Sequence, residues 1–295
     1  SRFPVFFVSH GGGPWPWVDG MREQFALTER EFRKLPALLP EKPKAVLVIT
    51  GHWESDAFTV STSAQPPMEY DYSGFPPHTY SIQYKAPGSP ALAARVRELL
   101  DKAGIASEEN SSRGFDHGTF VPLALMYPEA DVPVVMLSMN SNYDPKQHIA
   151  LGQALAPLRD EGILIMGSGL TYHNMRGFGR GTSTRVDEKF EDYLNEANTA
   201  PEAQRNDKLV HWEQGPFARQ AHPQEDHLIP LMVVAGAAGH DTGQCPVVWR
   251  IRWHFQACDW PPQRPAPAGW QTHRAQIVLQ YWRSQGCQSA AGSTR

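Results

Sequence analysis

The feature that most constrains this chain is the alternation of short apolar segments with longer amphipathic ones. Four runs are rich in β-branched residues and have the length of buried strands, namely residues 3–8, 45–50, 132–139 and 162–166. Helical periodicity covers residues 89–103, 145–158, 186–197 and 228–238. Strands that alternate with helices predict an α/β fold, with a central, largely parallel or mixed sheet and helices on both faces.

The composition favours a small molecule as the partner. Of the 295 residues, 41% are hydrophobic and 20% are charged, which is enough apolar material for a full core. A net charge of −4 provides no basic surface field, so nucleic acid and anionic membranes are poor candidates. No run approaches the roughly 18 apolar residues of a membrane helix, and no secretory signal precedes the first strand, so we expect a cytoplasmic protein. Oligomeric state is not predicted.

The last part of the chain differs from the rest in composition. Residues 241–295 are rich in Arg, Trp and Pro and contain five of the nine tryptophans. Three cysteines lie here in no CxxC pattern, which predicts neither a disulfide framework nor a zinc ribbon. We therefore expect residues 1–240 to form the main domain. The remainder is an appended module, an interaction tail or an altered, for example frameshifted, C-terminus, and we assign it no chemistry.

Three histidines stand where predicted strands end. His10 and His52 follow their strands directly, and His173 follows the strand of residues 162–166 after a glycine-containing turn. In open α/β sheets the ligand site lies beyond the carboxyl ends of the strands, so these side chains should converge there. A single histidine in such a place is more often structural. Three together indicate a metal site, because imidazole is a common ligand of zinc and iron.

Two further histidines lie in polar loops beside helical segments. His227 immediately precedes the helix of residues 228–238, where Asp226 is a candidate N-cap while His227 faces the site. His117 lies in the segment Gly-Phe-Asp-His-Gly, and we expect Asp116 to orient its ring. Both histidines are therefore candidates for the same cluster.

Five motifs in a fixed order carry a resemblance to a known family. They are Ser-His10-Gly-Gly-Gly-Pro, Gly-His52-Trp-Glu, Gly-Phe-Asp-His117-Gly, Tyr-His173-Asn and Glu-Asp-His227-Leu-Ile-Pro-Leu. Between Phe3 and Gly239 the chain resembles the class III extradiol ring-cleavage dioxygenases, specifically the DOPA 4,5-dioxygenase type. The resemblance implies one catalytic α/β domain over residues 1–240. It also implies one metal ion per chain, Fe(II) for activity or Zn(II) as the bound metal.

The resemblance also implies a role for each histidine. The implied metal ligands are His10, His52 and His227. His173 would be the acid/base histidine, close enough to be a fourth ligand of zinc, and His117 would contact substrate or dioxygen. Related catechol-cleaving enzymes use two histidines and a glutamate, so Glu225 is the fallback third ligand. Three neutral imidazoles leave the metal its full +2 charge, which a bound catecholate would offset. The implied partners are a small catechol and O2.

The substrate-binding candidates are Trp15, Phe75 and Arg176. The first two lie in long loops rich in aromatic residues and proline, which we expect to form walls of a pocket. Arg176 is a candidate partner for a substrate carboxylate. Two alternatives remain open: a zinc-dependent hydrolase that uses the same histidines, and a non-catalytic binding protein of the same fold. No HExxH helix supports the hydrolase.

Overall fold

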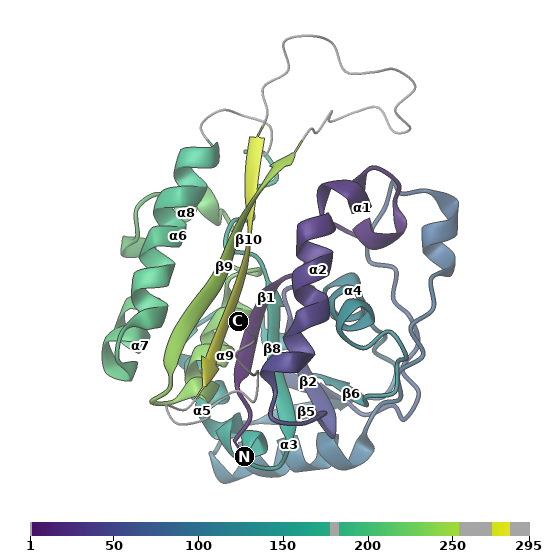
Figure 1. Cartoon of the computed structure of the whole chain (residues 1–295). Helices are drawn as coiled ribbons and strands as arrows, with labels where there is room; N and C mark the ends of the chain where they lie inside the picture. The colour runs from purple at the N-terminus through teal and green to yellow at the C-terminus, as the bar shows by residue number, and fades with distance from the viewer. Residues whose placement is uncertain (1, 178–182, 254–272, 284–295) are drawn as a thin grey trace, which may run out of the picture.

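The computed structural model describes residues 2–177, 183–253 and 273–283, which form a six-stranded sheet with helices on both faces (Figure 1). The strand order is β6 (Val134–Met136), β2 (Ala45–Thr50), β8 (Ile163–Gly169), β1 (Val5–Ser9), β10 (His273–Arg283) and β9 (Thr242–Trp253). The first four strands are parallel, whereas β10 runs antiparallel to both β1 and β9. The predicted α/β class with a mixed sheet is confirmed.

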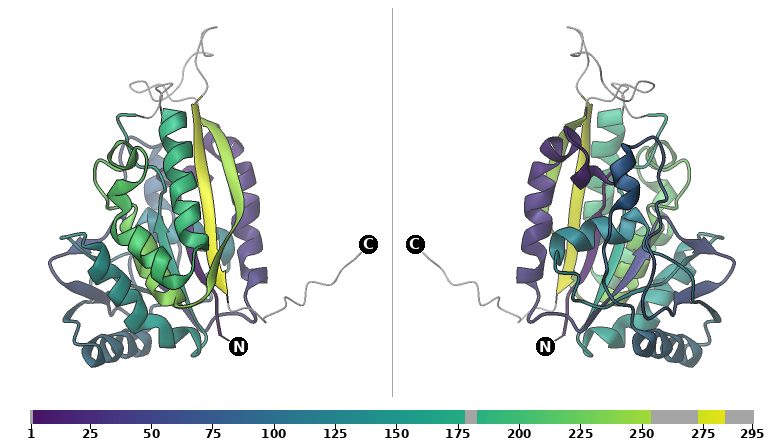
Figure 2. Two further views of the ribbon diagram at one scale, coloured as in Figure 1. Left: turned by 90° about the vertical axis from the view of Figure 1, so that its left-hand side faces the viewer. Right: turned by 90° about the vertical axis from the view of Figure 1, so that its right-hand side faces the viewer.

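The sheet divides the apolar core into two layers, as the alternation along each strand requires. In β1, Val5 and Phe7 belong to one core cluster, and Phe6 and Val8 belong to the other. The helices that line the first layer are α3 (Pro90–Lys102), α5 (Pro145–Leu155), α6 (Ser183–Thr199), α7 (Glu202–Val210), α8 (Ala218–Ala221) and α9 (Ile229–Ala238). The second layer is lined by α2 (Ala26–Lys34), next to the short α1 (Met21–Gln24), and α4 (His117–Met126). Figure 2 shows these two groups from opposite sides.

The predicted elements correspond to observed ones. Residues 132–139 contain β6 and the start of β7 (Met139–Asn140), which pairs with β3 (Glu54–Ser55). A second small parallel pair joins β4 (Phe58–Ser61) to β5 (Ser107–Asn110). The helix predicted from residue 89 is α3, and Ser89 caps it by accepting a hydrogen bond from the Leu92 N–H. Within the described residues no helix has the length and apolar character to span a bilayer.

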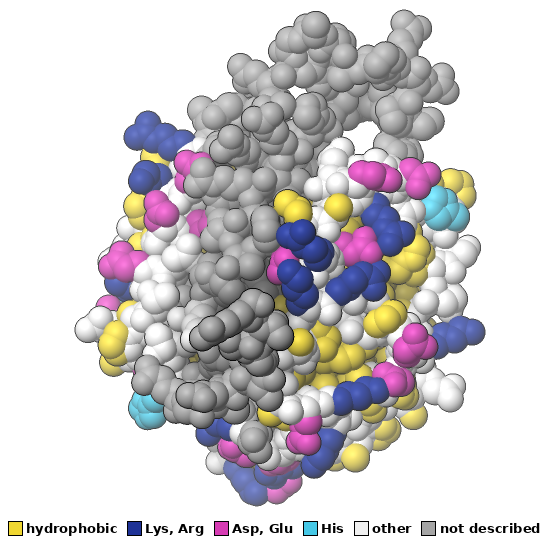
Figure 3. All heavy atoms as spheres, viewed as in Figure 1, with side chains coloured by type: hydrophobic (Ala, Val, Ile, Leu, Met, Phe, Trp, Pro, Cys, Tyr) yellow, Lys and Arg dark blue, Asp and Glu magenta, His cyan; other side chains and the backbone are white. Residues whose placement is uncertain are grey.

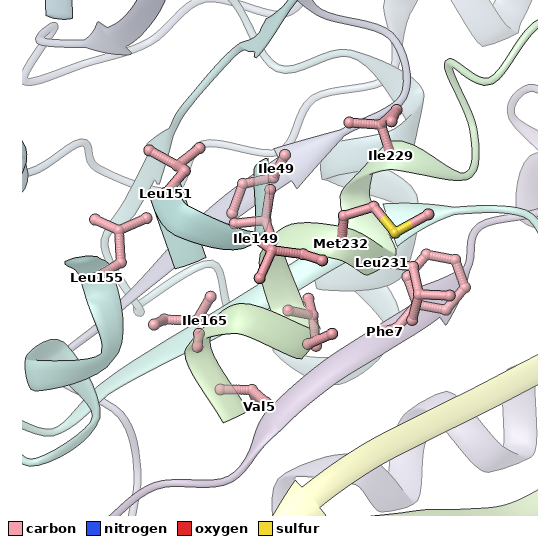
Figure 4. Packing of buried hydrophobic residues seen from close by; sticks show 14 of the residues in the cluster. Val5, Phe7, Ile49, Ile149, Leu151, Leu155, Ile165, Ile229, Leu231 and Met232 are labelled. Carbon is pink, nitrogen blue, oxygen red and sulfur yellow. The ribbon is translucent and has the colours of Figure 1, made fainter. Parts of the chain in front are cut away.

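Helix α9 is the centre of the first layer, and all ten of its residues are buried. It packs on β8 and β1 and against α5, as the close-up of the core shows (Figure 4). Glycines allow the contact with α5: a Cβ on Gly236 would lie 2.0 Å from the Ile149 carbonyl oxygen, and one on Gly152 would lie 1.9 Å from that of Val233. Because α9 begins two residues after His227, this packing fixes where that histidine lies.

Replacing Gly236 with alanine should destabilise the protein. In an open helix, Gly to Ala gains about 1 kcal/mol of helix propensity. Here the new methyl group would overlap backbone atoms of α5, and overpacking costs about 1–3 kcal/mol or more. We expect a lower midpoint of thermal unfolding by circular dichroism, and the same direction for Gly152→Ala. A higher midpoint would mean that the two helices separate without cost.

Two buried arginines close the C-terminal end of α9. The Arg159 side chain donates hydrogen bonds to the Ala237 and Ala238 carbonyls at 2.9 and 3.0 Å, and it forms an ion pair with Asp241. Arg205 donates to the Ala235 carbonyl at 3.0 Å. The last carbonyls of a helix have no partners inside the helix and carry its negative dipole end, so these cations stabilise α9.

The C-terminal segment contributes to the sheet. Strands β9 and β10 lie within residues 241–295, the segment of unusual composition, and their backbones extend the sheet next to β1. Within β10, Trp282 is fully buried and its Nε1 donates to the Asn198 carbonyl of α6 at 3.3 Å. The expected domain boundary at residue 240 therefore falls between helix α9, which packs on the sheet, and strand β9, which belongs to the same sheet. An altered C-terminus stays a prediction.

The face of the molecule in Figure 3 carries basic and acidic side chains intermingled around α2. Glu29 accepts hydrogen bonds from Arg22 and Arg33 there, and Lys34 pairs with Glu31. This side of the described structure therefore presents no one-sign field for a polyanion.

Candidate metal centre

The fold brings five histidines to the carboxyl ends of the parallel strands. His10 follows β1, His52 follows β2, and His173 lies in the loop after β8. His117 is the first residue of α4, and His227 immediately precedes the first turn of α9. The ring centroid of His52 lies 4.9 Å from that of His10, 4.0 Å from that of His117 and 4.7 Å from that of His227. The sequence-based expectation of convergence agrees with this geometry.

Three of the Nε2 atoms meet around His52. His52 Nε2 lies 3.0 Å from His10 Nε2 and 3.2 Å from His227 Nε2. Nitrogens bound tetrahedrally at about 2.05 Å from one metal ion stand about 3.3 Å apart. The potential ligands form two groups, and within each group all donor atoms lie within 4.8 Å of one another. The first group is His10, His52 and His117, and the second is His173, Asp226 and His227. The short Nε2 distances join these two groups at His52 into one centre.

The opposite ring nitrogens are held by polar partners. His10 Nδ1 lies 3.0 Å from Ser168 Oγ, and this hydroxyl donates its proton to the Gly118 carbonyl. The Ser168 oxygen must therefore accept from His10 Nδ1–H. Nδ1 of His227 lies 2.7 Å from Asp226 Oδ2, and Nδ1 of His52 lies 3.3 Å from Asp71 Oδ2. Each ring is thus fixed with its Nε2 lone pair towards the centre, as metal coordination requires.

Burial keeps the three imidazoles neutral. It lowers the pKa of His10 and His52 well below the usual value and that of His227 to about 4, and the neighbouring histidines add to the effect. A neutral imidazole offers the lone pair that a metal needs, without loss of a proton. The donor set and its supporting contacts therefore fit a divalent metal ion.

His173 lies against His227. Their rings stack with centroids 3.5 Å apart and an interplanar angle of 25°, and His173 Nδ1 lies 3.6 Å from Asp226 Oδ1. The backbone N–H of His173 donates to the Ala221 carbonyl at 2.9 Å, and Nε2 of His222 lies 2.8 Å from the Thr171 carbonyl oxygen. These contacts hold the loop after β8 against the segment that leads to α9.

The carboxylate that orients His117 is not the one expected. Asp71 lies 2.9 Å from His117 Nδ1 through both of its oxygens. Asp116, proposed for this role, instead caps α4 by accepting from the Thr119 N–H and pairs with Arg113 at 2.7 Å. The expectation for Asp116 was wrong because the N-terminal cap of the helix uses its side chain. Asp71, from a distant irregular loop, had no local sequence signal.

Asp226 and Glu225 also differ from their expected roles. Asp226 does not cap α9, whose N-cap residue is Leu228 without a side-chain bond; instead it accepts from His227. Although burial raises the pKa of Asp226, the adjacent His173 and His227 lower it below its usual range, so the carboxylate is charged. Glu225, the fallback ligand, forms an ion pair with Arg219 at 2.7 Å. Its carboxylate is therefore occupied by the arginine.

The substrate-binding candidates lie at different depths. Trp15 is fully buried, stacks on Phe25 and donates from Nε1 to the His10 carbonyl at 2.9 Å, so it supports the backbone of His10. Phe75 is half-buried, with its ring 5.4 Å from that of Tyr72. Arg176 is exposed. Contact of these three residues with a substrate stays a prediction.

Comparison with known proteins decides the family. The family described as the catalytic LigB subunit of aromatic ring-opening dioxygenase matches residues 4–257. This chain belongs to the LigB family. The match extends beyond residue 240 into β9 and confirms the resemblance and the dioxygenase class of enzyme that it implied. It sets aside the hydrolase and the non-catalytic binding protein.

Relatives of this LigB-family enzyme cover most of its length. The 4,5-DOPA dioxygenase extradiol of Beta vulgaris is 41% identical over 242 residues, which are 81% of this chain and 88% of that protein. The protein of the same name from Escherichia coli K12 is 34% identical over 240 residues, or 80% and 86% of the two chains. A crystal structure of an uncharacterized protein from Escherichia coli K12 aligns with a TM-score of 0.71 and 29% identity, covering 94% of this chain and 99% of that one.

Proposed function

We propose that this LigB-family enzyme opens the ring of a catechol beside the diol, using O2 and one Fe(II) ion. The observation that carries the proposal is the meeting of the His10, His52 and His227 Nε2 atoms at 3.0 and 3.2 Å, with two more histidines next to them. We assign these three residues as the metal ligands. A three-nitrogen set leaves open positions for a chelating diol and for dioxygen.

Fe(II) suits the proposed reaction better than Zn(II). The metal supplies a binding site that acidifies the diol and a redox path between the catechol and O2, and zinc lacks the redox chemistry. Three neutral imidazole ligands alone would leave the metal its full +2 charge. The structure adds the carboxylates of Asp71 and Asp226 directly behind two of the ligands, and they offset part of that charge.

His173 is the proposed acid/base residue. Its Nδ1 faces the charged Asp226 carboxylate, which favours a proton on Nδ1 and leaves Nε2 to take a proton from a diol hydroxyl. The same carboxylate stabilises the imidazolium that forms. The proton is then available for return to an oxygen atom as the ring opens.

The proposed role of His117 is to contact the substrate or dioxygen. Asp71 holds its Nδ1, so Nε2 is the nitrogen left for a ligand. Tyr72 stands edge-on to this ring, with centroids 6.0 Å apart, and the Phe75 ring lies 5.4 Å from that of Tyr72. This aromatic wall suits a flat catechol ring.

A DOPA-like catechol is the proposed substrate class. Its support is the name of the relatives from Beta vulgaris and Escherichia coli, 4,5-DOPA dioxygenase extradiol, together with the aromatic wall near His117. Arg176 is the proposed partner of a substrate carboxylate. Equal rates on carboxylated and uncarboxylated catechols would remove Arg176 from that role.

The test is anaerobic reconstitution with Fe(II), followed by oxygen uptake and visible absorbance on adding DOPA, catechol or protocatechuate. We expect uptake of one O2 per catechol and a yellow ring-opened product, both dependent on iron and both lost in His10→Ala. Tight metal binding without oxygen uptake on any catechol would overturn the proposed reaction.

A further inference from the structure

Asp71 touches two histidines of the centre at once. Both of its carboxylate oxygens lie 2.9 Å from His117 Nδ1, and Oδ2 also lies 3.3 Å from His52 Nδ1. Oδ1 further accepts the backbone N–H of His117 at 2.9 Å. One carboxylate therefore fixes a proposed ligand, a proposed substrate-facing ring and the first residue of α4.

The loop that supplies Asp71 is folded on itself and also carries the aromatic wall. The hydroxyl of Tyr70 donates to the Ile82 carbonyl and that of Tyr72 to the Thr79 carbonyl, both at 2.7 Å. Between these two tyrosines, the Asp71 side chain is only 16% exposed. Asp71 is thus the link between the wall and the histidines.

We propose that Asp71 is a positioning residue that orients His52 and His117 together, and so couples metal affinity to turnover. An acceptor on Nδ1–H fixes the tautomer and the ring plane of a metal-binding histidine. A carboxylate can accept from two Nδ1–H groups, whereas an asparagine has one acceptor oxygen and an NH2 group that opposes a second donor. Asparagine should therefore support one of these histidines but not both.

Asp226 makes a similar bridge on the other side of the centre. It lies 2.7 Å from Nδ1 of the proposed ligand His227 and 3.6 Å from Nδ1 of His173. Each carboxylate thus joins one proposed ligand to one histidine outside the ligand set. The inference about turnover rests on the proposed function, whereas the inference about metal affinity does not.

The first experiment measures zinc affinity of the full-length metal-free protein against a competing chelator. Asp71→Asn should weaken zinc binding 10- to 100-fold, the usual effect of removing a partner behind a ligand. Glu69→Gln is the matched control, because Glu69 lies in the same loop, pairs with Arg113 at 2.8 Å and makes no recorded contact with the five clustered histidines. We expect wild-type affinity for it. Equal losses in both variants would mean loosening of the loop and would overturn the proposal.

Proton NMR of the zinc-loaded protein gives a second readout. The Nδ1–H protons of His52 and His117 should resonate far downfield, because they face a carboxylate, and Asp71→Asn should shift or remove both signals. Signals and zinc affinity that match the wild type would overturn the proposal. If Asp71→Asn does not fold, Asp71→Ala and Asp71→Glu are compared instead. We expect the glutamate variant to bind zinc more tightly than the alanine variant. Equally weak zinc binding in both would contradict the role of the carboxylate.

Kinetics at saturating Fe(II) test the coupling to turnover. We expect Asp71→Asn to lower kcat with a smaller change in KM for the catechol, because a misplaced His117 affects reaction more than entry of the substrate. An unchanged kcat would overturn this part. If the wild type binds zinc but cleaves no catechol, the proposed function fails while the affinity comparison still decides the role of Asp71.

Discussion

Replacing His52 with alanine is expected to abolish both metal binding and ring cleavage. Its Nε2 lies 3.0 Å from that of His10 and 3.2 Å from that of His227, so the change removes the nitrogen that joins the other two. Loss of a partner behind a ligand already costs 10- to 100-fold in affinity, and loss of the ligand itself should exceed about 100-fold. Competition with a chelator measures metal binding, and oxygen uptake with Fe(II) and DOPA measures ring cleavage.

His211→Ala is the matched control for that experiment. His211 is about half exposed and lies beside Asp207 at the end of α7, in a different part of the fold. We expect wild-type metal content and turnover. If His52→Ala kept wild-type zinc affinity, His52 would not be a ligand, and the group formed by His173, Asp226 and His227 would be the metal site instead.

The histidines were predictable because each follows a local pattern. His10 and His52 end apolar runs that can only be buried strands, and the position of the strand then fixes the position of the side chain. The carboxylates behind them were not predictable in the same way. Asp71 lies 46 residues before His117 in an irregular loop, so only the tertiary fold brings the two together.

The four parallel strands and the central helices were also visible in the sequence, since burial on both faces leaves continuous apolar runs. Strands β9 and β10 were not. Their Arg- and Trp-rich sequences departed from that pattern, while their place in the sheet comes from backbone pairing with β1 and with each other. Backbone pairing leaves no residue-type signal of its own.

Replacing Arg159 with alanine is expected to cause the largest loss of stability. The side chain is fully buried and bonds to the Phe3, Ala237 and Ala238 carbonyls as well as to Asp241. Removing one partner of a largely buried ion pair costs about 3–5 kcal/mol, because the other charge, on Asp241 with 13% of its side chain exposed, is left without compensation. At about 2–4 °C per kcal/mol, the midpoint of thermal unfolding should fall by roughly 10 °C.

The control for this prediction is Arg33→Ala. Arg33 is about half exposed, and its ion pair with Glu29 should contribute less than about 1 kcal/mol. Equal shifts in the two variants would show that burial of the Arg159 pair does not matter. Circular dichroism melts of both proteins decide the question.

Arg159 also connects the two elements next to the proposed ligands His10 and His227. It bonds to Phe3 just before β1 and to the C-terminal end of α9, while His10 follows the other end of β1 and His227 precedes the other end of α9. Its replacement should therefore lower stability while leaving all the proposed metal ligands in place. A ligand that binds only the folded state raises stability by about 2.7 kcal/mol at 100 times its Kd, so zinc should restore much of the lost melting temperature in Arg159→Ala. Zinc should not raise the melting temperature of His52→Ala, because that variant lacks the proposed metal site.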